Sequence, residues 1–207
     1  MKPLARMQRG LETLYRVDTG VEVGDFVIGE AFRDELAPQR KPREQLLVVE
    51  DTGPNAELAL ALFIDPAVLA SLERGIGRHN LGDFLLAIEG VSHFIYAIQC
   101  ARTERRVSQL ELELQAEVDK YVTCLLHDVD SSEALRDRLF AGCEYEDDLD
   151  HDERERYRVA NDNAHRYAAW LEETYVERRR IPEMLGELRR FYRQGLAGKL
   201  STIARAA

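Results

Sequence analysis

The spacing of apolar residues changes once along this chain, close to Pro66. Before that point, short apolar runs alternate with polar turns, as in LETLYRVDTGVEVGDFVIGEAF, where Asp18-Thr19-Gly20 and Gly24-Asp25 separate the runs. Glycine and aspartate supply the backbone conformations and local side-chain bonds that tight turns need. After Pro66 the apolar residues recur about every 3.6 positions, which is typical of helices. The pattern therefore predicts strands first and helices afterwards.

A second hairpin is predicted from EQLLVVED and ELALALFI, with its turn at Asp51-Thr52-Gly53-Pro54-Asn55. Pro54 cannot donate a hydrogen bond to a strand ladder, so it marks the turn. A charged loop with prolines, residues 34–43, precedes this hairpin. We expect about four short strands in all.

Six helical segments are predicted after the strands. Asp65 and Pro66 form a cap and first turn, and Asn80 with Asp83 is predicted to cap a long helix. Pro182 is acceptable in the first turn of the last helix. The segments are 66–74, about 80–102, about 107–127, one from 131, one from DERERYR to about 178, and one from 182 nearly to the end.

These elements predict an α+β fold: a small N-terminal antiparallel sheet of about four strands packed on a C-terminal bundle of five to six helices. The expected division is a β-rich subdomain, 1–64, and a helical bundle, 65–207. Eight acidic residues among the first twelve of EYEDDLDHDERER indicate a solvated acidic linker at 144–156.

Composition narrows the partners and the compartment. The formal net charge of −10 disfavours nucleic acids and anionic membranes. The longest apolar stretch is interrupted by Glu89, Ser92, His93 and Gln99, so no membrane span is expected. The N-terminus lacks an apolar signal region, and the three cysteines lack CxxC spacing. We expect a cytoplasmic protein with reduced thiols.

The stretch LAIEGVSHFIYAIQCA places Glu89 and His93 one helical turn apart on a helix that is apolar on both sides. Such a helix is normally central in its bundle, and a buried carboxylate must be protonated, paired, hydrogen-bonded or metal-bound. One interpretation is a structural pair, with Arg102, Arg105 or Arg106 as further partners. The other is a ligand site.

A metal site would require more ligands from other helices. QLELELQAEVDKYV supplies Glu111 and Glu117, and ANDNAHRYAAWL supplies Asn161 and His165. Glu89, His93, Glu117 and His165 form the candidate metal set, which suits iron, manganese or zinc. The spacing is not that of the di-iron bundles, which use Glu-x-x-His twice, and the chain has no HExxH.

Other catalytic patterns are absent or explained by turns. Two Asp-Thr-Gly triplets, at residues 18 and 51, resemble the aspartic-protease motif, but too little of the chain is predicted as strand and hairpin turns account for both. There is no GxxxxGK[ST], GxGxxG or GxSxG. Cys100 and Cys124 lie in apolar helical surroundings that raise a thiol pKa, so a thiol enzyme is not expected.

The tail after Glu187 is a basic amphipathic segment that includes Arg189 and Arg193. Three interpretations are open for this segment: it packs on the protein and leaves its arginines in solvent, it docks on the acidic segment, or it binds an anionic partner. The candidate binding residues are therefore Glu89, His93, Glu111, Arg189 and Arg193.

Two function hypotheses remain open. The first is a cytoplasmic, non-enzymatic interaction or regulatory protein that binds a protein partner, because no complete catalytic constellation is present and charge is segregated along the chain. The second is a helical-bundle enzyme or sensor that binds a divalent metal or an anion with Glu89, His93 and a carboxylate of the next helix. A homodimer is also expected if Tyr15, Phe26 and Phe63 form an exposed strand edge.

Overall fold

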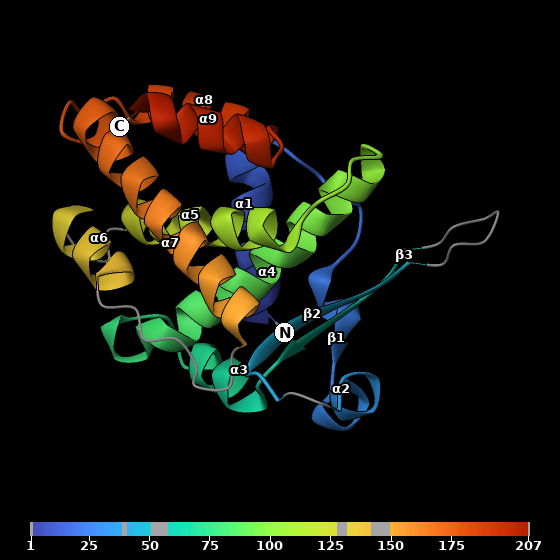
Figure 1. The fold of residues 1–207 in the computed structure, drawn as a ribbon. Coiled ribbons are helices and arrows are strands. Elements are labelled where there is room, and N and C mark those ends of the chain that lie inside the picture. Colours follow the sequence, from blue (N-terminus) through green and yellow to red (C-terminus); the bar gives the residue numbers. More distant parts are fainter. Residues whose placement is uncertain (1, 39–40, 51–57, 128–131, 142–149, 207) are drawn as a thin grey trace. The chain divides into compact units, whose positions relative to one another are not determined.

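The computed structural model describes residues 2–38, 41–50, 58–127, 132–141 and 150–206 (Figure 1). The chain forms two compact units. The first comprises Met1–Thr13 and Val17–Arg105, and the second comprises Leu14–Arg16 and Arg106–Ala207. A small sheet lies in the first unit and a helical bundle makes up the second, which confirms the α+β class. The subdomain boundary expected after residue 64 remains a prediction.

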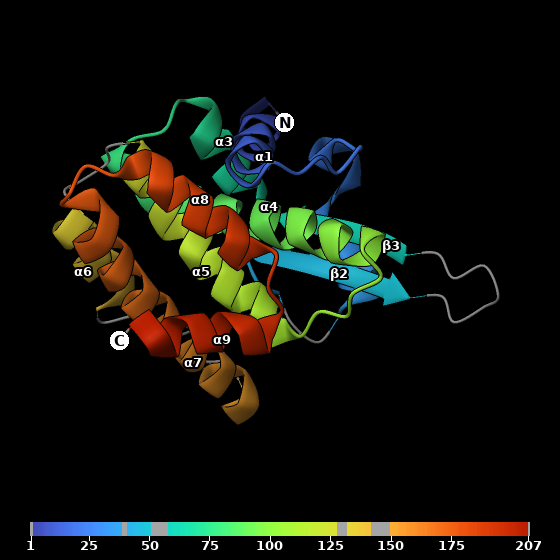
Figure 2. The same cartoon turned by 90° about the horizontal axis from the view of Figure 1, so that it is seen from above.

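The first unit combines the sheet with helices from both ends of its sequence. Its α4 packs against β2 and β3, and Figure 2 shows this helix running along the sheet. The elements are α1 (Lys2–Tyr15, whose last residues group with the second unit), η1 (Val23–Phe26), β1 (Val27–Ile28), α2 (Glu30–Leu36), β2 (Glu44–Glu50), β3 (Leu58–Ile64), α3 (Pro66–Glu73), η2 (Arg78–Asn80) and α4 (Leu81–Arg102).

The sheet has the order β1-β3-β2. β2 and β3 form the expected antiparallel hairpin, with Glu44 opposite Ile64, while the turn predicted at 51–55 lies outside the described residues. β1 pairs in parallel with β3 through Val27 and Leu62. Among the described residues the sheet therefore has three strands and is mixed, whereas about four antiparallel strands were predicted.

The prediction of strands before Val27 was wrong because this segment begins with α1. Its buried residues recur every three or four positions, at Leu4, Met7, Leu11 and Leu14, which is the spacing of one helix face. The predicted turn after it is confirmed. Gly20 has a φ of 70°, and its backbone N–H donates to Asp18 Oδ1 at 2.8 Å. The turn residues that follow α1 had led to the prediction of a hairpin on both sides of the turn.

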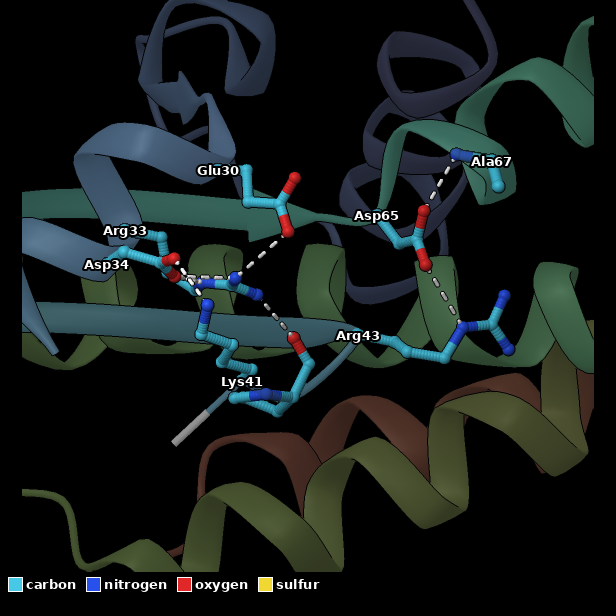
Figure 3. A network of polar contacts seen from close by, with 8 residues as sticks. Glu30, Arg33, Asp34, Lys41, Arg43, Asp65 and Ala67 are labelled. Carbon is cyan, nitrogen blue, oxygen red and sulfur yellow. Dashed lines mark hydrogen bonds and ion pairs between the residues drawn. The ribbon is translucent and has the colours of Figure 1, made fainter. Parts of the chain in front are cut away.

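The segment predicted as a charged loop contains α2, and Arg33 organises it (Figure 3). This buried side chain pairs with Asp34 at 2.6 Å, donates to the Pro42 carbonyl at 3.1 Å and lies 4.2 Å from the centre of the Phe63 ring. Lys41 pairs with the same Asp34 at 2.9 Å. A buried guanidinium is tolerated here because acceptors and a ring face surround it.

The start of α4 differs in detail from expectation. Asp65 caps α3 as predicted, by accepting from Ala67 N at 2.8 Å. Asn80 makes no side-chain cap bond to α4, because its Oδ1 accepts instead from the Gly77 N–H at 2.9 Å. Its Nδ2 donates to the carbonyls of Ser71 at 3.2 Å and Gly75 at 2.8 Å. Asn80 thus closes the loop between two helices.

One helical stretch of the described chain, Arg78–Arg102, is long and apolar enough to cross a membrane by length and composition. Within the protein, 72% of its most apolar window is buried. The mostly buried core helix of a soluble protein passes the same test of length and composition.

The second unit is helical throughout its described residues. Within it α5 packs along α7, and α6 and α9 also contact α7. The elements are α5 (Gln109–Leu126), α6 (Ser132–Phe140), α7 (His151–Leu171), the π-helical turn η3 (Glu172–Val176), α8 (Ile181–Tyr192) and α9 (Leu196–Ala206).

Two boundaries in this unit depart from the prediction. The last predicted helix is two helices, α8 and α9, separated at Arg193–Gly195, where glycine lowers helix propensity. The first part of the acidic linker predicted at 144–156 lies outside the described residues, and its second part, from Asp150, opens α7 with a capping box between Asp150 and Glu153.

A fully buried polar network lies in the core of the second unit. Asp119 Oδ1 accepts from the Tyr15 hydroxyl and from Gln115 Nε2, the latter at 2.8 Å. The Gln115 carbonyl accepts from Lys199 Nζ, and this ammonium lies 4.8 Å from the centre of the Phe191 ring. Asp119 is 1% exposed and Lys199 is 0% exposed. The network joins residues that are far apart in sequence, so no local pattern predicted it.

Three buried tyrosines have raised pKa values. Burial is the main cause in each case. A neighbouring carboxylate raises the pKa further: Asp119 for Tyr15, Glu187 for Tyr167 and Glu172 for Tyr121. A raised folded-state pKa contributes stability that is complete below pH of about 10 and is lost as pH rises further. Each tyrosine adds a slope of about 1.4 kcal/mol per pH unit.

We therefore expect the free energy of unfolding to fall steeply above pH of about 10, measured by urea denaturation at several pH values. Tyr121→Phe is the control, because the Tyr121 hydroxyl has no hydrogen-bond partner within the described chain. This variant should keep its neutral-pH stability and show a shallower alkaline slope. An unchanged slope in Tyr121→Phe would contradict the assignment.

Candidate metal centre

The centre is built on α4, which carries Glu89 and His93 through the core of the first unit. His93 is 6% exposed, and Glu89 is half-buried one turn before it. The expectation that this helix is enclosed on both sides is confirmed. Buried side chains come from both stripes of the helix: Phe84, Ile88, Val91 and Ile95 from one, and His93, Tyr96 and Cys100 from the other.

The structure brings a third side chain to this pair, Glu44 at the start of β2. One potential ligand atom from each of Glu44, Glu89 and His93 lies within 4.8 Å of the others. The Glu44 side chain is 10% exposed, so it points into the protein rather than into solvent. Sequence reasoning had missed Glu44.

The spacing within the group is informative. His93 Nδ1 and Glu44 Oε1 are 3.6 Å apart, which is longer than a normal N–H···O hydrogen bond. Two ligands bound to one tetrahedral zinc-sized ion at about 2.1 Å stand roughly 3.4 Å from each other. The distance is close to that between two ligands of a shared cation, and it is also that of an ion pair between Glu44 and a protonated His93. A divalent ion would also balance the charges of the two carboxylates.

Gly90 makes room for Glu44 beside α4. A Cβ atom at residue 90 would lie 3.0 Å from both Cγ and Oε1 of Glu44, and 3.1 Å from Cδ1 of Leu62. Real Cβ atoms rarely approach so closely, so any larger residue would displace the carboxylate. The bare backbone at Gly90 thus allows the strand side chain to reach the helix between Glu89 and His93.

Arg43 fixes the start of β2 and with it the position of Glu44. Its guanidinium pairs with Asp65 at 3.3 Å and with Asp83 at 3.1 Å, which ties the strand to the beginnings of α3 and α4; Figure 3 shows the bond to Asp65. The Ser71 hydroxyl, and then Arg43, lower the pKa of Asp83. These ion pairs anchor the residue directly before Glu44.

The arginines expected as partners of Glu89 and His93 make other bonds in this unit. Arg102 donates to the Asp18 carbonyl at 2.6 Å. Arg105 donates to the Tyr96 hydroxyl at 2.9 Å and to Cys100 Sγ at 2.8 Å. Arg102 therefore links the end of α4 to the turn at Asp18, and Arg105 packs back on α4 itself.

The remaining predicted metal residues belong to the second unit and are not part of the group. Glu117 pairs with Lys120 at 2.7 Å, and His165 stacks on Phe140 with ring centres 5.5 Å apart. Glu111 is buried in the first turn of α5, and Asn161 is buried on α7. In the described part of the chain, the cluster of three or more potential metal ligands is the one at Glu44, Glu89 and His93.

Arg189 and Arg193, candidate binding residues from the sequence, donate to backbone carbonyls at the end of α1. Arg189 Nε donates to Leu14 O at 2.8 Å, and Arg193 donates to Tyr15 O at 3.2 Å. The expected exposed aromatic edge was wrong, because Tyr15 is 1% exposed and Phe63 is 2% exposed.

The thiols and the first Asp-Thr-Gly triplet have structural roles. Burial raises the pKa of the Cys124 thiol to about 12, which makes it a poor nucleophile as expected. Cys100 is a buried free thiol, and Cys143 lies outside the described residues. The Asp18 carboxylate accepts a hydrogen bond from the backbone N–H of Gly20 in the turn that it begins. The triplet at residue 51 lies outside the described residues.

Comparisons with protein-family models, with curated proteins and with solved structures find no match to this chain.

Proposed function

We propose that this protein binds a divalent transition-metal ion through Glu44, Glu89 and His93. The observation that carries the proposal is the convergence of two carboxylates and an imidazole from β2 and α4, with ligand atoms within 4.8 Å of one another. Mixed imidazole and carboxylate ligands suit zinc, manganese and iron(II). The carboxylate partner comes from a strand, whereas the sequence had suggested the next helix.

Three protein ligands leave at least one coordination position for water or a substrate atom. Structural zinc sites usually use four protein ligands, whereas catalytic sites use three. The proposed role is therefore a metal-dependent enzyme or sensor rather than a metal-stapled scaffold. A bound ion would polarise an oxygen ligand or lower the pKa of bound water.

Metal titration of untagged protein tests the proposal. Chelator-treated protein should bind one equivalent of zinc or manganese in isothermal titration calorimetry, and the metal should raise the melting temperature through preferential binding to the folded state. Absence of stoichiometric binding for zinc, manganese and iron(II) would refute the proposal.

Gly90 offers a sharper test of the geometry. Gly90→Ala should weaken metal binding about tenfold, because Glu44 must move away from His93 while the other ligands stay in place. Gly82→Ala is the matched control on the same helix, since a Cβ there would meet nothing within 4 Å. Competition titrations with a fluorescent chelator give both affinities. Equal affinities in the two variants would contradict the role of Gly90.

A second candidate is a cytoplasmic interaction or regulatory protein that acts as a homodimer. It is favoured by Phe32 and Leu36, which stand one turn apart on α2 and are 49% and 45% exposed. Large apolar side chains paired on one exposed helix face are frequent at protein interfaces. Sedimentation analysis of metal-free protein tests this candidate, and a monomer at high concentration counts against it.

A further inference from the structure

Three arginines gather in the second unit where α1 ends. Arg189 donates through Nε to Leu14 O, and Arg193 donates to Tyr15 O and, through its other terminal nitrogen, to Arg189 O at 2.8 Å. Arg16 is the next residue along the chain. Two guanidinium groups, one from α8 and one from the residue that directly follows it, thus lie at consecutive carbonyls beside a third arginine.

These cations are not paired with acids in the part of the chain that the structure describes. Other arginines of the same unit have carboxylate partners: Arg190 pairs with Glu187, Arg136 with Glu172 and Arg180 with Glu183. No such pair is formed by Arg16, Arg189 or Arg193 among the described residues. Within the described part of this acidic chain, whose formal charge is −10, the three neighbouring arginines thus form no ion pair with an acid.

The bonds to backbone carbonyls use only some of the N–H donors of these three arginines. The negative end of the α1 dipole attracts cations, which accounts for the bonds of Arg189 and Arg193. Arg189 makes its bond through Nε, and no described residue accepts from its two terminal nitrogens. Desolvation, and then the neighbouring charges of Arg16 and Arg193, lower the pKa of Arg189. A multivalent anion would relieve this repulsion.

We propose that Arg16, Arg189 and Arg193 form a binding site for a phosphate group. A phosphate dianion offers several oxygens to the planar guanidinium fork and carries more charge than a single carboxylate. The site is independent of the metal centre, which lies in the first unit. The ligand class is a small phosphate-bearing molecule, and its simplest probe is inorganic phosphate.

The backbone at Arg16 permits a clean variant. Its φ is 54°, a left-handed conformation that glycine adopts without strain, so Arg16→Gly removes the guanidinium and preserves the helix end. Arg179 is a matched control in the same unit, because its φ is 55° and it is also exposed. Arg179→Gly changes the backbone preference and the net charge in the same way.

Inorganic phosphate should be titrated into the full chain at constant ionic strength, after chelator treatment so that no metal binds the probe. Calorimetry should show saturable binding, and the Nε–Hε resonances of Arg189 and Arg193 should shift in nuclear magnetic resonance spectra. Arg16→Gly should lower the affinity about tenfold, the value of one charge-assisted hydrogen bond. Arg179→Gly should stay within about twofold of the wild type.

Three outcomes would overturn the proposal. These are absence of saturable binding to the wild type, equal weakening in both glycine variants, and shifts that spread over all arginine resonances. The last two would indicate general attraction between charges. A metal-free protein that binds phosphate normally supports this site even if the metal proposal fails.

Discussion

Asp119→Ala is expected to lower the free energy of unfolding by about 3–5 kcal/mol, the loss typical of breaking a buried charged network. Asp119 is 1% exposed and accepts hydrogen bonds from Tyr15 and Gln115. Alanine removes both acceptor bonds from the network, which also contains the Lys199 ammonium, 0% exposed, through Gln115. Urea denaturation at neutral pH measures the change.

Asp119→Asn is the matched control. The amide keeps an oxygen that accepts from the Tyr15 hydroxyl, although it removes the negative charge. We expect a smaller loss of about 1–2 kcal/mol, since the hydrogen bonds are retained in neutral form. Equal free energies of unfolding for Asp119→Ala and Asp119→Asn would contradict this role of the network. So would a free energy of unfolding for Asp119→Ala within about 1 kcal/mol of the wild type.

His93→Ala should weaken metal binding at least about 100-fold. Loss of a partner outside the coordination shell already weakens metal sites by about 10–100-fold, so loss of the imidazole itself must reach the upper end of that range. Glu44→Gln should have a comparable effect, because an amide keeps the shape of the side chain but removes one of the two balancing charges. Competition with a fluorescent chelator measures both affinities.

His165→Ala and Glu117→Gln serve as controls for these ligand variants. Both residues were candidates for the metal set from sequence, and both lie outside the group formed by Glu44, Glu89 and His93. They should retain wild-type affinity. Loss of binding in His165→Ala with retention in His93→Ala would place the ion in the second unit and reject the proposed centre.

The N-terminal error shows how local signals compete. The helical spacing of Leu4, Met7 and Leu11 was visible in the sequence, but the turn residues Asp18, Thr19 and Gly20 follow closely and favoured a hairpin. The turn was predicted correctly and the element before it was not. A period of 3.6 and a period of two are hard to separate over a few apolar residues.

The polar residues of the candidate metal centre were also predicted only in part. Glu89 and His93 were predicted together because a helix places positions four apart on one face. Their carboxylate partner was not predictable, since Glu44 reaches them through the pairing of β2 with β3 and the space left by Gly90. The network of Tyr15, Gln115 and Lys199 was missed for the same reason.

By itself, then, the sequence determined that the chain after Pro66 is helical, although not the division of its last segment into α8 and α9. It also determined the pairing of β2 with β3 and the burial of α4, because each follows from short-range periodicity and turn chemistry. Tertiary structure alone decided which polar groups meet. Contacts such as Glu44 with His93, or Arg193 with the Tyr15 carbonyl, join segments that are distant along the chain. Their formation depends on strand register and helix packing, which no local window of residues encodes.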